Sequence, residues 1–383
     1  MADHRLPAPL SSDGQPAPAT FVIAEAGVNH NGSLELAFAM IDAAAAAGAD
    51  AVKFQSFKTE RYVSRTAQKA EYQIRTTGAD ERQFAMIKRL ELAEESQRTL
   101  AARCRERGIR CLFSPFDEES VDFVAHELGM PVLKLPSGEV TNGPLLLRAG
   151  RTGRSLILST GMSLLGEVEE ALGVLAWAMT TPCRDGERPT RDDFIGAYRS
   201  GAGRRALAER VTLLHCTTEY PTPFTDVNLR AMDTLRDAFG LPVGYSDHTP
   251  GIAIPVAAVA RGASVIEKHF TLDRTMEGPD HAASLEPGEL RAMVEAIRAV
   301  EQGLGSPLKA PAAAEVKNIP IARKALVAAV PIRRGEVFQP HMIAMKRPAA
   351  GLSPMAYWSL VGLHADRDYH EDEPLAFPGS QPG

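Results

Sequence analysis

Eight short runs of mostly apolar residues, many of them β-branched, recur along the chain between residues 21 and 270. They begin at Phe21, Asp50, Ile109, Pro131, Ser155, Val211, Leu241 and Ser264. Nearly continuous apolarity is typical of strands that are buried on both faces of a parallel sheet. We therefore expect eight parallel strands in this part of the chain.

Between these runs lie longer stretches with helical spacing of apolar residues, namely 34–47, 96–107, 118–128, 228–239 and 287–304. Ser33 is placed to cap the first of them, and Gly48 follows its end, where the left-handed backbone of a helix terminus favours glycine. Eight strands that alternate with helices predict a (β/α)₈ TIM barrel in the α/β class. An open, doubly wound sheet is the alternative.

Composition divides the chain further. Residues 1–18 are polar and proline-rich, which indicates a loose tail, and 19–305 form the expected barrel domain. Residues 306–318 read as a linker before a small domain of short strands at 319–378. About 60 residues are marginal for independent stability, so we expect this domain to pack on the barrel or on a neighbouring subunit. Two insertions, 56–92 and 180–206, interrupt the regular alternation.

The chain has 383 residues, 44% of them hydrophobic, and a net charge of −6. It has no long basic run, which argues against a nucleic-acid partner. The most apolar segment, 252–260, is interrupted by Pro255 and is too short to span a membrane. Four cysteines without paired spacing, together with the absence of a signal-peptide pattern, indicate reduced thiols in a cytoplasmic protein.

Polar and ionisable residues follow or end all eight expected strands, where a TIM barrel carries its active site. The candidates are Glu25, Lys53, Gln55, Ser114, Lys134, Ser137, Glu139, Ser159, His215, Thr217, Tyr220, Ser246, Asp247, His248, Glu267, Lys268 and His269. An unpaired charge in a buried strand costs several kcal/mol. The recurrence of polar and ionisable residues at all eight strand ends therefore indicates an enzyme.

Lys53 and Lys134 have two functional interpretations. They can bind a phosphate group together with nearby hydroxyls, or one of them can form a Schiff base as in an aldolase. A structural Lys–Glu pair inside the barrel is the third possibility. The number of hydroxyl residues at the same strand ends favours phosphate.

His248 and His269 end neighbouring strands of the expected barrel. Two imidazoles there can share one divalent metal ion whose other ligands are water molecules, or they can form hydrogen bonds without a metal. Spacing alone leaves both interpretations open. Asp247 is also a candidate N-cap of the next helix, and His215 is equally consistent with core packing and with catalysis.

Several motifs carry a resemblance to a known family. They are IAEAGVNHNGSLELAFAMIDAAAAAGADAVKFQ, FSPF, KLPSGE, LSTGM, HCTTEYPTPF, GYSDHT, EKHFTLD and GPDH, in this order. The chain resembles the sialic acid synthases, and its tail, with IRRGEVF and MKRP, resembles their antifreeze-like SAF domain. The resemblance implies condensation of phosphoenolpyruvate with an open-chain N-acetylated amino sugar and water, which releases phosphate.

The resemblance leaves the acceptor sugar open among N-acetylmannosamine, its 6-phosphate and 2,4-diacetamido-2,4,6-trideoxymannose. The product is then N-acetylneuraminate or N,N'-diacetyllegionaminate. The sequence TTEYP after the sixth strand, with Thr218 two residues before the tyrosine, and the insertion before that strand look more like synthases of legionaminate or of bacterial neuraminate variants. A Schiff-base pyruvate aldolase on the same barrel is the alternative function. A binding protein with an inert barrel is disfavoured because the lysines and histidines are intact.

The resemblance also implies roles for individual residues. His248 and His269 would bind the divalent metal, with Mn²⁺ expected first and Mg²⁺ or Co²⁺ as alternatives. Phosphoenolpyruvate would be bound by Lys53, Ser114, Lys134, Ser137, Ser159 and Ser246. The sugar would contact Gln55, Tyr220, Asp280 and Arg347, the last of them reaching over from the partner in a domain-swapped homodimer. The catalytic carboxylates would be Glu25, Glu139 and Glu267.

Overall fold

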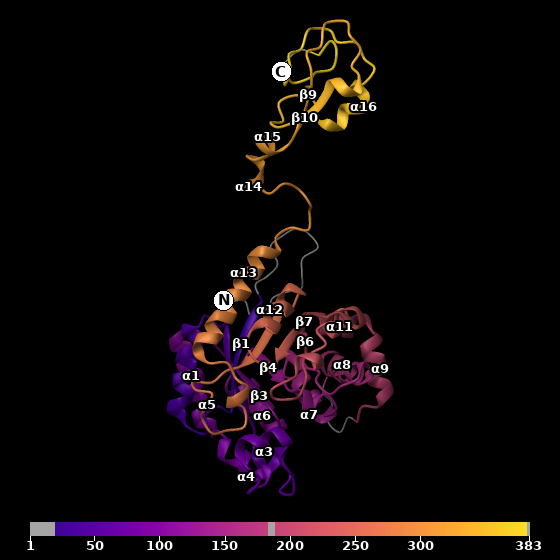
Figure 1. Ribbon diagram of the computed structural model, residues 1–383. Coiled ribbons are helices and arrows are strands. Elements are labelled where there is room, and N and C mark those ends of the chain that lie inside the picture. The colour runs from indigo at the N-terminus through magenta and orange to yellow at the C-terminus, as the bar shows by residue number, and fades with distance from the viewer. Residues whose placement is uncertain (1–19, 183–187, 381–383) are drawn as a thin grey trace. The chain divides into compact units, whose positions relative to one another are not determined.

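In the computed structural model, which describes residues 20–182 and 188–380, eight parallel strands form a nearly closed barrel (Figure 1). Their bounds are β1 Phe21–Gly27, β2 Ala51–Ser56, β3 Arg110–Pro115, β4 Val132–Leu135, β5 Ser155–Ser159, β6 Val211–His215, β7 Val243–Asp247 and β8 Val265–His269. The order β3-β2-β1-β8-β7-β6-β5-β4 places every strand beside its neighbour in the chain, with β3 and β4 adjacent at the seam. A doubly wound sheet would reverse its order at one point, so the expected barrel is confirmed.

Helices surround the strands (Figure 1). They are α1 Leu34–Ala46, α5 Glu94–Arg107, α6 Glu118–Asp122, α7 Gly143–Arg151, α8 Leu165–Thr180, α11 Ala231–Phe239, α12 Ala253–Ala260 and α13 Pro287–Leu304. Ser33 caps α1 as expected, since its hydroxyl accepts a hydrogen bond from the Leu36 amide at 3.3 Å. Gly48 follows that helix at φ +81°, a conformation that glycine adopts without strain.

Two expected helices differ in detail. The helix expected at 118–128 is α6 followed by a π-helical turn at Phe123–Glu127, and α11 begins at Ala231 rather than at residue 228. The insertion after β2 contains α2 Thr59–Tyr62, α3 Glu71–Thr77 and α4 Gln83–Leu90. The later insertion contains α9 Arg191–Arg199 and α10 Gly201–Arg210. Short 3₁₀ turns lie at Ser137–Glu139, Phe224–Asp226, His281–Ala283, Pro340–Met342 and Pro354–Ala356.

The barrel interior is filled at one level by an apolar layer. One buried side chain from each of seven strands contributes to this layer, with Phe21 as a second residue from β1: Phe21, Ile23, Ala51, Leu112, Val132, Ile157, Leu214 and Val265. On β7 the corresponding position is Gly244, where an added Cβ would lie 2.4 Å from the Val265 carbonyl oxygen. Because strand side chains alternate, the residue two positions further along each strand also points inward. The side chains available for catalysis therefore lie in the next inward-facing layer, above the apolar one.

The chain divides after Gly305 into a second unit that begins at Ser306. It contains α14 Ala313–Val316, α15 Ile319–Ala322, the antiparallel strands β9 Ala325–Ala328 and β10 Ile343–Lys346, and α16 Tyr357–Leu360. Its own core includes Leu326, Phe338, Leu360 and Tyr369.

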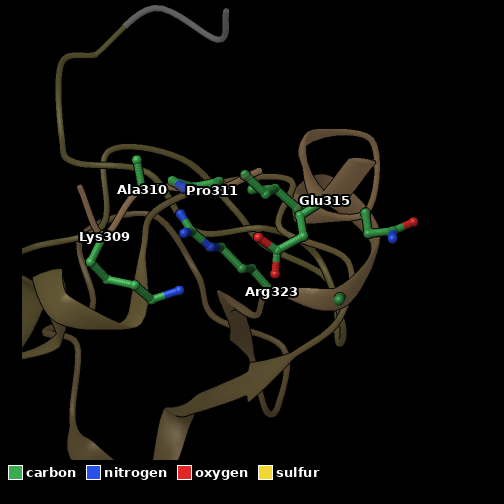
Figure 2. Close-up of a pocket in the computed structure, with 8 residues that line it drawn as sticks. Lys309, Ala310, Pro311, Glu315 and Arg323 are labelled. Atoms are coloured by element: carbon green, nitrogen blue, oxygen red, sulfur yellow. The ribbon is translucent and has the colours of Figure 1, made fainter. Parts of the chain in front are cut away.

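The segment around α14 and α15 also lines a pocket of about 420 Å³, to which Lys309, Glu315 and Arg323 contribute (Figure 2). None of its lining residues is a predicted site residue. None of the helices in the described ranges has the length and apolarity that crossing a bilayer requires.

Candidate active site

A ring of polar side chains lies directly above the apolar layer of the barrel. Counting two residues on from Gly244 and from each member of that layer except Phe21 gives Glu25, Lys53, Ser114, Lys134, Ser159, Cys216, Ser246 and Glu267, all of which are buried. Seven of these eight were predicted from the sequence as site residues. The eighth, Cys216, was missed, although the same count of two from Leu214 would have found it.

Six members of this ring form one connected network. Lys53 Nζ lies 2.8 Å from Glu25 Oε2 and 3.4 Å from Glu267 Oε2, and it donates to Ser114 Oγ at 3.0 Å. Lys134 Nζ lies 3.3 Å from Glu267 Oε1, which also accepts a hydrogen bond from Ser246 Oγ at 2.9 Å. The Lys–Glu pairing expected as one interpretation of the lysines is therefore present.

Burial and pairing change the protonation of this network. Burial opposes the charged form of Lys53, but the Glu25 and Glu267 carboxylates outweigh burial and raise its pKa. Burial lowers the pKa of Lys134. Burial alone would raise the pKa of Glu267, yet Lys134 and Lys53 hold it down at about 2. The pKa of Glu25 shifts in the opposite direction, because burial raises it to about 7 although the positive charge of Lys53 opposes the rise.

The turns after β4 and β5 converge beside this ring. The Gly161 amide donates to Ser137 Oγ at 3.0 Å, and Ser137 Oγ lies 3.1 Å from Cys216 Sγ. Ser159 Oγ is buried and, among the described residues, has no hydrogen-bond partner. A backbone amide, two hydroxyls and the Lys134 ammonium thus lie on or directly after neighbouring strands β4 and β5, and donors of this kind suit an oxyanion or phosphate group.

His248 and His269 lie at the mouth of the barrel with ring centres 5.5 Å apart. His248 Nδ1 lies 2.6 Å from the Thr217 carbonyl oxygen, which can only accept, so this nitrogen carries the proton and Nε2 keeps its lone pair. His269 Nδ1 is buried and has no hydrogen-bond partner within the described residues. Burial lowers the pKa of His248 and lowers that of His269 well below its usual range.

These histidines fit a metal site that the protein completes only in part. Metal ions bind imidazole in its neutral form, which the lowered pKa values of both rings favour. Within residues 20–182 and 188–380, no group of three or more His, Cys, Asp or Glu side chains is arranged to hold a metal ion. Any ion held by the two imidazoles would take its other ligands from substrate oxygen atoms or water.

The predicted sugar-contact residues Tyr220 and Asp280 adjoin the histidines. The Tyr220 ring centre lies 4.2 Å from that of His248 and 5.5 Å from that of His269. Asp280 Oδ2 lies 4.0 Å from His269 Nδ1, and burial raises the Asp280 pKa to about 6. Gln55, at the end of β2, is half-buried and lies opposite Ser114 in the β2–β3 ladder.

Glu139 belongs to the barrel unit, whereas Arg347 belongs to the second unit. Glu139 is buried in the turn after β4 and accepts a hydrogen bond from Asn142 Nδ2 at 2.6 Å, and burial raises its pKa. Arg347 directly follows β10 in the second unit and is exposed there. The structure describes Arg347 within that unit alone, so its predicted reach over the sugar stays a prediction.

Three strand-end candidates face away from the barrel interior. Lys268 Nζ and Asp247 Oδ2 form a fully buried ion pair 2.5 Å apart, and the Thr249 hydroxyl also donates to Asp247 at 3.0 Å. Asp247 is therefore not the N-cap of α12, whose N-cap is Ile252. His215 Nε2 lies 2.7 Å from the Val227 carbonyl oxygen, which corresponds to the core-packing interpretation.

The site also contains residues that the sequence did not indicate. Besides Cys216, they are Gly161, where an added Cβ would lie 2.9 Å from both Ser137 Oγ and Cys216 Sγ, and Tyr72 of α3. The Tyr72 ring centre lies 4.9 Å from that of Tyr220. Nothing in the local sequence distinguishes Tyr72 from an ordinary packing residue, because its partner is 148 positions away.

Comparisons with known proteins match both units. The model of the NeuB family matches residues 40–309, and that of the SAF domain matches residues 323–378. N,N'-diacetyllegionaminic acid synthase of Campylobacter jejuni is 49% identical over 92% of this chain and 98% of its own. The synthase of the same name from Legionella pneumophila is 42% identical over 89% of each chain. The crystal structure of N-acetylneuraminic acid synthetase from Leptospira borgpetersenii is 31% identical, with a TM-score of 0.64 over 83% of this chain and 97% of that one.

Proposed function

Because the chain belongs to the NeuB family and ends in an SAF domain, we propose that it is a phosphoenolpyruvate-dependent synthase of N,N'-diacetyllegionaminate. Its acceptor is 2,4-diacetamido-2,4,6-trideoxymannose in the open-chain aldehyde form. The observation that carries the proposal is the buried ring of two lysines, two carboxylates and several hydroxyls at the end of the barrel. The acceptor follows from the two legionaminic acid synthases named above and from the TTEYP sequence of this chain.

The proposed reaction forms a carbon–carbon bond to the sugar and a carbon–oxygen bond to water, and it breaks the carbon–oxygen bond to phosphate. The methylene carbon of phosphoenolpyruvate attacks the aldehyde carbon of the sugar, and water adds to the enol carbon. The tetrahedral intermediate then loses inorganic phosphate and leaves a 2-keto acid. No Schiff base is needed, so both lysines serve as cations that hold the carboxylate and phosphate of phosphoenolpyruvate.

The position of each residue indicates which part of the substrate or which step it serves. Lys134, Ser137, Ser159 and the Gly161 amide suit the phosphate, and Ser246 belongs with them because it donates to the same Glu267 oxygen that Lys134 approaches. Lys53 and Ser114 lie at the other carboxylate oxygen of Glu267 and suit the carboxylate. Glu25 is the best-placed general base for the attacking water, because a group whose pKa is about 7 both accepts and releases a proton at neutral pH. Glu139, also buried with a raised pKa, is the second candidate.

His248 and His269 would hold the divalent metal ion, for which Mn²⁺ is the first choice. When bound, the ion supplies Lewis-acid polarisation of the aldehyde oxygen. Around it, Tyr220 presents its ring to both imidazoles, and the Thr217 carbonyl fixes the protonated nitrogen of His248. These contacts orient the imidazoles before substrate arrives.

The assembly is proposed to be a domain-swapped homodimer in the cytoplasm, in which Arg347 of one chain reaches the sugar of the other. Exposed apolar side chains on each unit support an additional interface. Met162 and Leu164 after β5 are 72% and 75% exposed, and Met355 and Trp358 of the second unit are 80% and 76% exposed. Light scattering of the purified chain tests the dimer, and a monomer at all concentrations would contradict it.

A Schiff-base aldolase is the second candidate, because burial lowers the pKa of Lys134 and so favours the neutral amine that this chemistry requires. The two functions predict different outcomes with borohydride. An aldolase would be trapped as a pyruvate adduct on lysine and would not respond to chelators. The proposed synthase forms no such adduct.

The experiment that tests the proposal measures phosphate release from phosphoenolpyruvate. Parallel reactions contain 2,4-diacetamido-2,4,6-trideoxymannose, N-acetylmannosamine or its 6-phosphate, each with Mn²⁺ and with chelator. We expect release that depends on the sugar, is lost with chelator and is fastest with the diacetamido sugar. Faster release with N-acetylmannosamine would reassign the acceptor. No release with any sugar, together with a borohydride adduct, would replace the synthase by the aldolase.

A further inference from the structure

The insertion after β2 carries α3, a helix of seven residues that is held in place from within the insertion. A helix of this length is unstable alone, because isolated helices need about 12–15 residues. Lys69 Nζ donates to the carbonyl oxygens of Thr77 at 3.3 Å and Gly78 at 3.0 Å, at the C-terminal end where the helix dipole favours a cation. The Lys69 side chain is 1% exposed. Contacts within the insertion thus hold α3 in place in addition to its contacts with the rest of the barrel.

From this position α3 contacts the loop that follows β6. The Tyr72 ring packs on the Tyr220 ring, with centres 4.9 Å apart and planes tilted by 39°. Arg75, one turn along the same helix, pairs with Glu219 at 3.1 Å. Tyr220 is flanked in turn by His248, so its ring lies between α3 and the proposed metal ligand.

The same helix reaches the loop that follows β8. Thr76 Oγ1 lies 3.4 Å from the carbonyl oxygen of Pro279, the residue before Asp280. Burial raises the pKa of the Tyr72 hydroxyl, and the Asp280 carboxylate adds to that rise, so the two groups are close enough to interact. One short helix therefore contacts both loops that carry the predicted sugar-binding residues Tyr220 and Asp280.

We propose that Tyr72 is a positioning residue for the acceptor sugar, which holds Tyr220 against His248 and thereby shapes the sugar side of the site. The inference rests on the proposed function for what the site binds. The residues assigned to phosphoenolpyruvate lie on the strands and on the turns after β4 and β5. Within the described residues, α3 forms no hydrogen bond or ring contact with any of them. Loss of the Tyr72 ring should therefore weaken binding of the sugar and spare phosphoenolpyruvate.

The kinetic test compares Tyr72→Ala and Tyr72→Phe with Ile74→Ala, a control on the same helix whose residue is 41% exposed. An aromatic pair contact corresponds to a factor of about two to ten in binding. We expect Tyr72→Ala to raise the KM for the sugar by that factor at unchanged KM for phosphoenolpyruvate. Tyr72→Phe keeps the ring and should restore the wild-type KM, and Ile74→Ala should resemble wild type.

Two kinetic results would overturn the assignment. An unchanged sugar KM in Tyr72→Ala would show that Tyr220 needs no support from α3. Equal defects in Tyr72→Phe and Tyr72→Ala would assign the effect to the hydroxyl rather than to ring packing. Unchanged thermal unfolding midpoints in all three variants are expected, since the substitutions leave the barrel core intact.

A second measurement does not depend on catalysis. Hydrogen–deuterium exchange of the segments around Tyr220 and Asp280 is compared among the same variants without substrate. We expect faster exchange in Tyr72→Ala alone. If wild type releases no phosphate with any sugar, the proposed function fails while this comparison still tests the contact. Identical exchange in wild type and Tyr72→Ala would refute the positioning role by itself.

Discussion

Substitution of Gly161 by alanine tests whether the turns after β4 and β5 form the phosphate site. Gly161 lies where both turns meet, and its amide donates to Ser137 Oγ at 3.0 Å. An added Cβ would lie 2.6 Å from Thr218 Oγ1, 2.9 Å from Cys216 Sγ and 2.9 Å from Ser137 Oγ. Side-chain atoms do not approach this closely, so at least two of these groups must move.

The neighbours differ in how easily they can move. Thr218 is exposed and can rotate away, whereas Cys216 is buried and lies 3.1 Å from Ser137 Oγ. The methyl group would therefore push Ser137 away from the Gly161 amide. Inserting a methyl group into a packed site costs about 1–3 kcal/mol. If that cost falls on the bound state, the KM for phosphoenolpyruvate rises about 5- to 150-fold.

Gly138 provides a matched control in the adjoining turn. An added Cβ at Gly138 would have no atom within 4 Å, although the residue directly follows Ser137. The assay is steady-state phosphate release with phosphoenolpyruvate varied at saturating sugar and the reverse. We expect Gly161→Ala to raise the KM for phosphoenolpyruvate alone and Gly138→Ala to leave both KM values near wild type.

The comparison can refute the reasoning in two ways. A wild-type KM for phosphoenolpyruvate in Gly161→Ala would remove these turns from the phosphate site. Equal defects in both variants would point to lost backbone freedom rather than to the contact with Ser137 and Cys216. The first result, accompanied by a lowered unfolding midpoint, would also show that the added methyl group destabilises the fold rather than the bound state.

Three further predictions concern other parts of the site. His269→Ala should abolish Mn²⁺ binding measured by calorimetry, and binding equal to wild type would remove it from the ligand set. Arg347→Ala should raise the KM for the sugar at an unchanged unfolding midpoint, whereas unchanged kinetics would exclude its reach over the acceptor. Since the pKa of Glu25 is raised to about 7, its carboxylate form is lost as the pH falls through 7, and phosphate release should fall with it. Glu25→Gln should lose this acid limb and lower kcat about 10²–10⁴-fold, while Glu139→Gln should keep the limb if Glu25 is the base.

The fold was predictable because its signals are local. Continuous apolar runs predict buried parallel strands, and glycines such as Gly108 and Gly240 follow the helices that the spacing predicts. Of the two expected helices that differ, 118–128 does so because its second half winds as a π-helical turn at Phe123–Glu127. Phe123, Val124 and Ala125 are buried in this turn, and three consecutive apolar residues do not distinguish it from an α-helical turn.

The candidate site was predictable only up to the direction in which each side chain points. Lys268 and Glu267 are neighbours on β8, yet Glu267 lies in the polar ring inside the barrel. Lys268 instead forms a buried pair with Asp247 on the outer face of the strands. A strand buried on both faces shows no alternation of polarity, so its sequence does not say which residues face inward. The pairing of the strands does not supply that information by itself, because the β1–β8 ladder places Ile23 of the apolar layer opposite Glu267 of the polar ring. The direction of each side chain follows from the closed barrel.

A single sequence does not show which turns contact one another. These contacts determine the role of small residues such as Gly161. Gly161 is 24 positions from Ser137 and 55 from Cys216, yet the three meet because β4, β5 and β6 are adjacent in the barrel. The short turns PSG and STG carry little information separately. Their convergence makes Gly161 a position where Thr218, Cys216 and Ser137 leave no space for a side chain, so a strand end is best judged by what its neighbouring strands bring to it.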